Sequence, residues 1–175
     1  MRKFIIALIG CLALVTGAAQ AHGPSRLKTD QTVKLNATPA EVWAVIGSFT
    51  DMSWYPGVKS VEATGSEKGA TRVRTMENGT VIHEELLKLD PAKFAISTRF
   101  TEDNLEAVKA TNYASHITIK DEGGKAVVDW KGAFYRGYPN NDPPADLNDE
   151  ASTASVEAVH QAGIDALVAR FGKAE

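Results

Sequence analysis

The chain has 175 residues, of which 43% are hydrophobic, and its 19 basic and 22 acidic residues give a formal net charge of −3 at pH 7. This length and hydrophobic content suit one globular domain whose core needs no disulfide or metal for stability. The acidic balance and the lack of any run of lysines or arginines in the sequence argue against nucleic acid and anionic membranes as partners.

The first 21 residues have the pattern of a secretory signal peptide. A positively charged start is followed by an apolar run over residues 4–15 and by Ala19-Gln20-Ala21, a small-x-small site for a signal peptidase. As a helix this run spans only about 18 Å, which is short of the ~30 Å hydrocarbon core of a bilayer. We therefore expect cleavage after Ala21, a periplasmic protein and no permanent membrane anchor.

The only cysteine of the sequence, Cys11, lies inside this segment. Leu8-Ile9-Gly10-Cys11 fits the loose pattern of a bacterial lipoprotein processing site, so a lipid-anchored chain that begins at Cys11 is the alternative to cleavage after Ala21. Cleavage after Ala21 leaves residues 22–175 as one domain with 17 basic and 22 acidic residues, a formal charge of −5. That domain has no thiol, which excludes disulfides, cysteine-ligated zinc and a cysteine nucleophile.

Histidines are the remaining candidates for metal ligands. His22 would become the amino terminus of the cleaved chain, where an amino group and an imidazole can chelate copper together. The sequence places no second histidine near it, and His83-Glu84-Glu85 lies on an expected strand, where neighbouring side chains point to opposite faces. We therefore expect no metal and no cofactor.

A strand over residues 32–35 is followed by the best-marked helix start in the chain. Thr38 is expected to cap the helix, Pro39 suits its first position, and Glu41 completes a capping box. Gly47 and Ser48 end the helix, and a second short helix is expected to present Trp54 and Tyr55.

The chain from residue 58 to residue 135 alternates apolar and polar residues in short runs separated by turn residues, as half-buried strands do. Together with the first strand this predicts seven strands, at residues 32–35, 58–64, 71–76, 81–89, 93–100, 112–120 and 126–135. Asn78-Gly79 predicts a type I′ hairpin turn.

A loop with three prolines follows at residues 137–150, and apolar residues at helical spacing then predict a helix over residues 151–171. Gly172 is the expected C-cap, and a helix of this length is about 32 Å long, enough to cross a curved sheet.

The order of these elements and three local strings resemble the START-like, or SRPBCC, helix-grip superfamily of polyketide cyclases, lipid-transfer domains and plant hormone receptors. The strings are GTVIHEELLKLD at residues 79–90, NYASHITI at 112–119 and VVDWKGAF at 127–134. The resemblance covers about residues 32–171. It implies an α+β helix-grip fold: a seven-stranded antiparallel sheet curved around a long C-terminal helix, with two short helices after the first strand and ligands bound between sheet and helix.

Carried over onto this sequence with the two-residue period of strands, the resemblance implies a ligand pocket with mixed polar and aromatic walls. Its inward side chains would be Lys59, Glu84, Leu86, Tyr113, Ser115, Trp130 and Phe134, with Trp54 and Tyr55 as a lid. His160 borders the apolar stripe of the last helix, where it either looks into the pocket or forms a hydrogen bond at the edge of the core. His83 and His116 fall on the outward phase of their strands.

Within the superfamily, the export signal, the start His22-Gly23-Pro24 and the string Trp54-Tyr55-Pro56 resemble periplasmic proteins of the MxaD type. That resemblance implies an accessory protein of quinoprotein methanol oxidation. Such a protein has no redox centre of its own and assists electron transfer from methanol dehydrogenase to its cytochrome c partner.

Two alternatives remain open. The protein would be a periplasmic carrier of a small hydrophobic ligand or lipid, because the expected pocket is largely aromatic. It would otherwise be a polyketide cyclase or dehydratase-like enzyme in which Glu84 and Lys59 transfer protons. We expect binding rather than catalysis, with no catalytic residue, because buried ion pairs occur in ligand pockets without turnover.

Overall fold

The computed structural model describes residues 23–175, which form seven antiparallel strands and two α-helices joined by turns and loops. The elements are β1 (Leu27–Leu35), α1 (Pro39–Ile46), β2 (Val58–Ala63), β3 (Thr71–Met76), β4 (Val81–Asp90), the 3-10 helix η1 (Pro91–Lys93), β5 (Ala95–Phe100), β6 (Ala110–Glu122), β7 (Lys125–Arg136) and α2 (Asp149–Phe171). The expected signal peptide and His22 lie outside the described residues.

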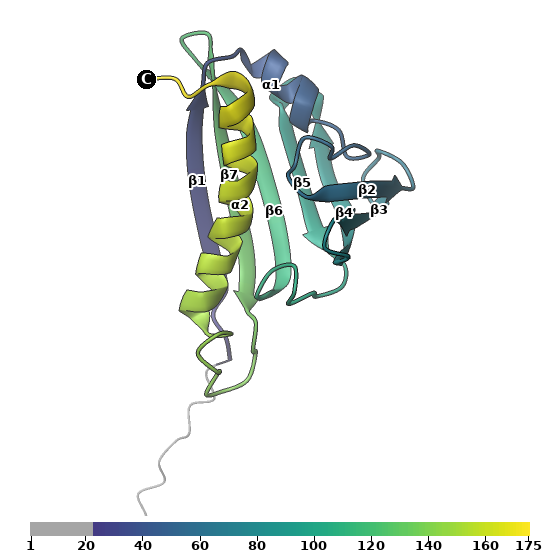
Figure 1. Ribbon diagram of the computed structural model, residues 1–175, viewed down its shortest axis with the longest axis vertical. Helices are drawn as coiled ribbons and strands as arrows, with labels where there is room; N and C mark the ends of the chain where they lie inside the picture. Colours follow the sequence, from purple (N-terminus) through teal and green to yellow (C-terminus); the bar gives the residue numbers. More distant parts are fainter. Residues whose placement is uncertain (1–22) are drawn as a thin grey trace, which may run out of the picture.

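The strands form one sheet in the order β1-β7-β6-β5-β4-β3-β2. The first strand therefore pairs with the last, and all other pairs are neighbours along the chain. Figure 1 shows the sheet curving around α2, which packs against β1, β7 and β6, while α1 covers one end of β6 and β7. The expected α+β helix-grip fold is confirmed.

The start of α1 follows from the capping box that the sequence predicts. The Glu41 N–H donates to Thr38 Oγ1 at 3.3 Å, and the Thr38 N–H donates to Glu41 Oε2 at 2.8 Å. The expected second short helix does not form, because residues 51–57 form a series of turns. The Asp51 carboxylate accepts from the Ser53 N–H at 2.8 Å, as an N-cap does, and the Tyr55 N–H donates to the Met52 carbonyl at 3.0 Å. The segment stops after this one turn because Pro56 has no N–H and Gly57 has a φ of +74°.

One of the two tight hairpin turns differs from what the sequence indicated. Asn78-Gly79 does not form a type I′ turn, since only Gly79 has a positive φ, and the loop has three residues closed by the Gly79 N–H on the Met76 carbonyl at 3.0 Å. The pair Gly123-Gly124, with φ values of +65° and +80°, supplies the two positive angles of a two-residue turn between β6 and β7.

The long helix α2 begins where Asn148 Oδ1 accepts from the Ala151 N–H at 2.8 Å and ends before Gly172, whose φ is +77°. Its buried face consists of Ser152, Val156, His160, Gly163, Ile164 and Leu167. After the helix the chain returns to β1, where Lys173 pairs with Leu35. No helix of residues 23–175 is long and apolar enough to cross a membrane.

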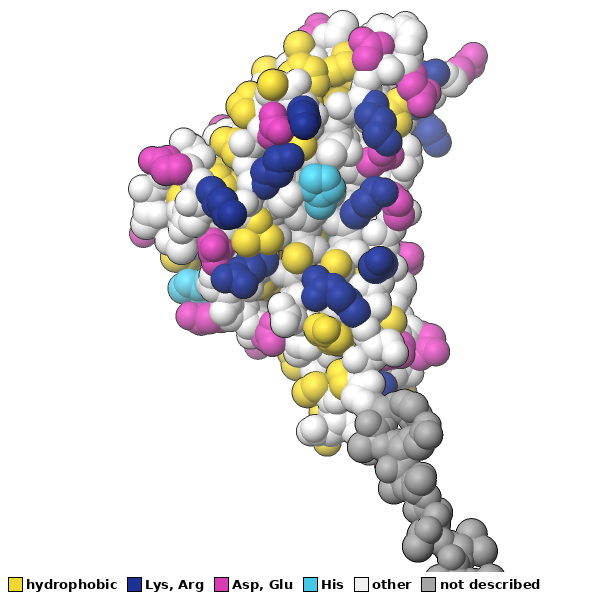
Figure 2. Space-filling model, turned by 180° about the vertical axis from the view of Figure 1, so that it is seen from behind, with side chains coloured by type: hydrophobic (Ala, Val, Ile, Leu, Met, Phe, Trp, Pro, Cys, Tyr) yellow, Lys and Arg dark blue, Asp and Glu magenta, His cyan; other side chains and the backbone are white. Residues whose placement is uncertain are grey.

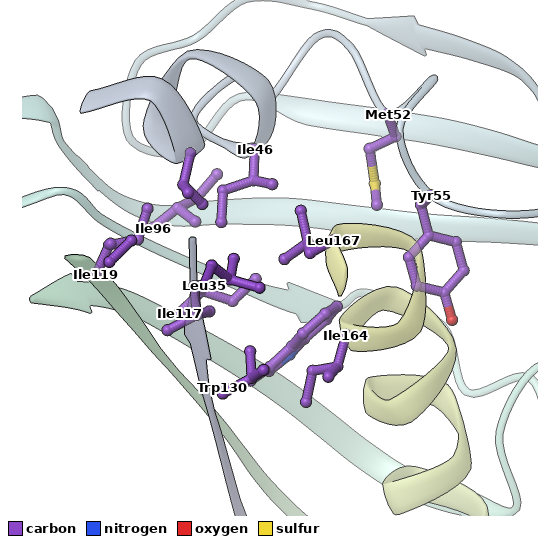
Figure 3. Close-up of a cluster of buried hydrophobic side chains, with 14 of the residues drawn as sticks. Leu35, Ile46, Met52, Tyr55, Ile96, Ile117, Ile119, Trp130, Ile164 and Leu167 are labelled. Carbon is purple, nitrogen blue, oxygen red and sulfur yellow. The ribbon is translucent and has the colours of Figure 1, made fainter. Parts of the chain in front are cut away.

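The main core lies between the sheet, α1 and α2. Figure 3 shows Ile117 and Trp130 of the sheet with Ile46 of α1 and Ile164 and Leu167 of α2 in this cluster. A second cluster lies nearer the start of α2, with Ile82, Phe100, Val108, Ala110, Tyr113, Phe134 and Val156. The packing of both clusters holds α2 across the sheet.

The opposite face of the sheet is charged and carries many Lys and Arg side chains (Figure 2). Exposed Lys131 lies 3.0 Å from Asp30 there. His116 shares a hydrogen bond of 2.6 Å with Ser97, and burial together with nearby lysines lowers its pKa. His83 of β4 also faces this outer side of the sheet and is half-buried.

Candidate functional site

A small cavity lies between the sheet, α2 and the turn that follows α1. Its volume is about 50 Å³, enough for a few water molecules. Trp54, Tyr55 and Trp130 form an aromatic wall, and charged side chains of β3 and β4 lie at another part of the lining. The cavity is therefore apolar over most of its surface and charged in one place.

The structure brings together six of the residues that the sequence assigned to a pocket. Those lining the cavity are Trp54, Tyr55, Glu84, Tyr113, Ser115 and Trp130. Leu86 and Phe134 are fully buried but belong to the two core clusters and do not line the cavity. His160 is fully buried behind the cavity wall, where it contacts Tyr113 and Trp130.

Lys59 is not part of the site, contrary to the sequence interpretation. It is exposed, because the pairing of β2 with β3 shifts between Val58 and Ser60 and leaves Lys59 as the extra residue of a β-bulge. The bulge breaks the two-residue alternation, and Val58 and Val61 pack on the core instead. The expected pair of Glu84 with Lys59 therefore does not exist.

Glu84 lies between two arginines that the sequence reading missed. The Arg72 Nε donates to Glu84 Oε2 at 2.8 Å, and Arg74 Nε lies 3.4 Å from the same oxygen. All three residues are about 95% buried. Burial raises the pKa of Glu84, but attraction by Arg74 and Arg72 outweighs it, so the pKa lies below its usual value. The cavity thus holds a carboxylate and two guanidinium groups.

A signal for the two arginines is present in the sequence. Arg72 and Arg74 are two residues apart on β3 and so share one face, and Arg72 is directly opposite Glu84 on β4. Val73, between them, faces outward and is only half-buried. Two arginines in phase on the strand next to an inward glutamate are therefore the sequence signal for this cluster.

The aromatic wall is held against α2. The Tyr55 hydroxyl donates to the Val159 carbonyl of α2 at 2.8 Å. The ring centroids of Trp54 and Trp130 are 6.1 Å apart, and those of Tyr55 and Trp130 are 6.5 Å apart. Gly163 makes this approach possible, since a β-carbon there would lie 2.4 Å from the Trp130 ring.

A chain of polar groups runs behind this wall. The Trp130 Nε1–H donates to Ser115 Oγ at 2.9 Å, the Tyr113 hydroxyl and His160 Nε2 share a hydrogen bond of 2.8 Å, and the His160 ring stacks on Trp130 at 4.9 Å. Burial lowers the pKa of His160 to about 4 and raises the pKa of Tyr113. Both groups are therefore neutral at pH 7.

Residues 26–172 match the model of a protein family described as polyketide cyclase/dehydrase and lipid transport. The chain belongs to this family. No curated protein matches it in sequence.

Several solved structures have the same fold as this chain. An uncharacterised protein from Bacillus thuringiensis is 24% identical with a TM-score of 0.68, over 83% of this chain and 98% of its own. The protein XoxI from Bacillus cereus is 23% identical with a TM-score of 0.68, over 82% and 94%. Truncated norcoclaurine synthase from Thalictrum flavum is 15% identical with a TM-score of 0.60, over 83% and 93%. At these identities the likeness establishes the fold.

In this family member the titratable groups of the cavity favour binding over proton transfer. Glu84 is held as an anion by two guanidinium groups, so it neither donates a proton at pH 7 nor accepts one readily. Tyr113 and His160 are neutral and bonded to each other. Among residues 23–175, no three His, Cys, Asp or Glu side chains come together in a way that could hold a metal ion.

Proposed function

We propose that the protein binds a small, largely apolar molecule in the cavity between the sheet and α2, and carries it unchanged. The observation that supports this is the burial of three charged side chains, Arg72, Arg74 and Glu84, against walls that are otherwise aromatic. Buried ion pairs are often no more stable than apolar replacements of the same volume. Charged groups kept in such a cavity are typical of a functional site.

The size of the cavity limits the ligand. Sites for drug-sized molecules measure about 300–1,000 Å³, whereas this cavity measures about 50 Å³ and a neighbouring hollow about 110 Å³. Tyr55, Arg74 and Val159 line both. A ligand of more than a few atoms therefore requires the turn with Trp54 and Tyr55 to move away from α2, which breaks the hydrogen bond from Tyr55 to Val159.

The cyclase or dehydratase alternative is weaker for this chain. It relied on Glu84 and Lys59 as a proton-transfer pair, and Lys59 is exposed on the bulge of β2. A carboxylate bonded to an arginine binds polar groups well but is a poor base. Carriage of a ligand is the function that these contacts support best.

The test compares two serine-to-tryptophan variants in a binding assay with N-phenyl-1-naphthylamine, an uncharged dye that fluoresces in apolar sites. Ser48 is half-buried and lines the cavity, whereas Ser53 is exposed on the same segment. We expect the wild type and Ser53→Trp to bind the dye and Ser48→Trp to lose at least ten-fold in affinity. A wild type that does not bind, or equal binding by both variants, would overturn the proposal.

A second candidate is the accessory role in quinoprotein methanol oxidation, in the periplasm. It is supported by the signal-peptide pattern of residues 1–21 and by the MxaD-like string Trp54-Tyr55-Pro56. The intact mass of the exported protein should correspond to a chain that begins at His22, and a diacylated Cys11 would exclude the soluble periplasmic form.

The partner test is cytochrome c reduction by purified methanol dehydrogenase, with and without this protein. Stimulation that weakens as salt rises is expected if the two proteins meet through charged surfaces. Trp54→Ala should reduce the stimulation, because Trp54 is a half-buried aromatic at the edge of the site. The absence of stimulation at any salt concentration would remove this candidate.

A further inference from the structure

The cavity carries an unbalanced positive charge. Arg72 and Arg74 face one carboxylate, that of Glu84, and the other titratable groups around them, Tyr55 and Tyr113, are neutral at pH 7. His160, behind the wall, is neutral as well, and the exposed Glu106 lines only the neighbouring hollow. One cationic charge therefore remains without a buried counterion.

The two arginines differ in how their donors are used. Arg72 donates from Nε to Glu84 and from Nη1 to the Phe49 carbonyl at 3.0 Å. Arg74 Nε lies 3.4 Å from Glu84 Oε2 as an ion pair but is buried without a hydrogen bond among residues 23–175, and its side chain is only 7% exposed. The Arg74 guanidinium carbon lies 5.4 Å from the Tyr55 ring centroid, a cation–π contact.

The Arg74 side chain lies between two hollows of the protein. Arg74 lines both the cavity and the neighbouring hollow, as do Tyr55 and Val159. A group bonded to Arg74 would therefore have the aromatic wall of Trp54 and Trp130 on one side and the apolar surface of Met76 and Ile82 on the other.

We propose that Arg74 binds an anionic group of the ligand, so that the protein takes a small acid with an aromatic or other apolar body. A guanidinium presents planar paired donors that match a carboxylate or sulfonate, and an anion there would neutralise the surplus charge. The body of the ligand would lie along Trp54, Tyr55 and Trp130. This inference rests on the proposed function, since it names the class of ligand for the same cavity.

The test uses two dyes with the same ring skeleton. 8-Anilinonaphthalene-1-sulfonate carries an anionic group, and N-phenyl-1-naphthylamine lacks it. We expect the wild type to bind the sulfonate at least ten-fold more tightly than the uncharged dye. Naphthalene-2-carboxylate should displace the sulfonate at concentrations at which naphthalene-2-carboxamide does not.

Arg74→Met removes the charge and leaves Arg72 and Glu84 as a neutral pair, so the fold should persist, which circular dichroism would verify. This variant should lose the preference for the sulfonate while still binding the uncharged dye. Arg74→Lys should keep part of the preference. Arg99→Met is the matched control, because Arg99 is 52% exposed, pairs with Glu85 and lies outside the cavity lining.

The outcomes separate the two proposals. Equal affinities for the two dyes in the wild type would overturn the anion inference and leave the cavity proposal standing, and so would an unchanged preference in Arg74→Met. Failure of both dyes to bind would overturn both proposals. If Arg74→Met does not fold, the affinity ratio of the wild type decides, and a ratio of one or less refutes the role of Arg74.

Discussion

Replacing Glu84 with glutamine keeps the size of the side chain and removes the negative charge between Arg72 and Arg74. The two guanidinium groups are then buried without their carboxylate, and a buried pair that loses one partner is typically destabilised by about 3–5 kcal/mol. The glutamine oxygen can still accept from Arg72 Nε, which donates to Glu84 at 2.8 Å. We therefore expect the lower end, about 3 kcal/mol, or a fall in Tm of roughly 6–12 °C.

The assay is urea unfolding at pH 7, followed by tryptophan fluorescence. Glu85→Gln is the matched control, because it is the next residue of β4 and also pairs with an arginine, at 2.7 Å from Arg99 Nη2. Arg99 is half exposed, so the control should lose less than about 1 kcal/mol. A similar loss of unfolding free energy in both variants would show that burial does not determine how much the Glu84 carboxylate contributes to stability.

The dependence on pH gives a second check. The arginines lower the pKa of Glu84 in the folded protein despite its burial. The stability that the Glu84 carboxylate adds is therefore complete above its pKa in the unfolded chain, about 4.3, and is lost as the pH falls through its lower pKa in the folded protein. The difference between the wild type and Glu84→Gln should therefore shrink below about pH 4. The reasoning would be refuted if the wild type and Glu84→Gln were equally stable at pH 7, or if their difference in stability stayed the same in acid.

Three further predictions concern α2 and α1. Gly163→Ala should destabilise the protein by about 1–3 kcal/mol in thermal unfolding, because its β-carbon would lie 2.4 Å from the Trp130 ring. Alanine normally favours a helix, so a gain in Tm would contradict this prediction. The stability of the wild type should fall by about 3 kcal/mol between pH 7 and pH 4, since the unfolded chain protonates His160 near 6.5 and the folded chain only at about 4; a flat profile of urea midpoints would count against it. Thr38→Ala should cost about 1 kcal/mol in urea unfolding through loss of the N-cap, and an unchanged midpoint would show that the cap contributes nothing.

The helices could be predicted because their ends are marked by local chemistry. Thr38 and Glu41 satisfy each other's backbone groups, and Gly172 takes the positive φ at the end of α2, so nearby residues in the sequence suffice to locate both. The prediction of a second short helix was wrong for an equally local reason: Pro56, which has no N–H, and Gly57, whose φ is +74°, stop the segment after one turn.

The candidate site could be predicted only where strands are regular. Alternation placed Ser115 and Trp130 inside, because β6 and β7 pair without a shift in register from Ala114 to Glu122. Lys59 was misplaced because an extra residue in β2 leaves no mark on composition. The inward arginines of β3 were not predicted, because apolar residues are expected inside and charged ones outside. Their partner, Glu84, lies on a different strand.

The pairing of the first strand with the last has a consequence for the order in which the chain folds. The Thr32 hydroxyl donates to Asp129 across 97 residues of sequence, and all of β1 is paired with β7. Contacts so distant in sequence form late and slowly, on the millisecond-to-second scale of non-local β topologies, because a long loop must close first. During synthesis the chain leaves the ribosome amino end first, so β1 stays unpaired until β7 has emerged. Only after that can α2 meet the surface that it covers.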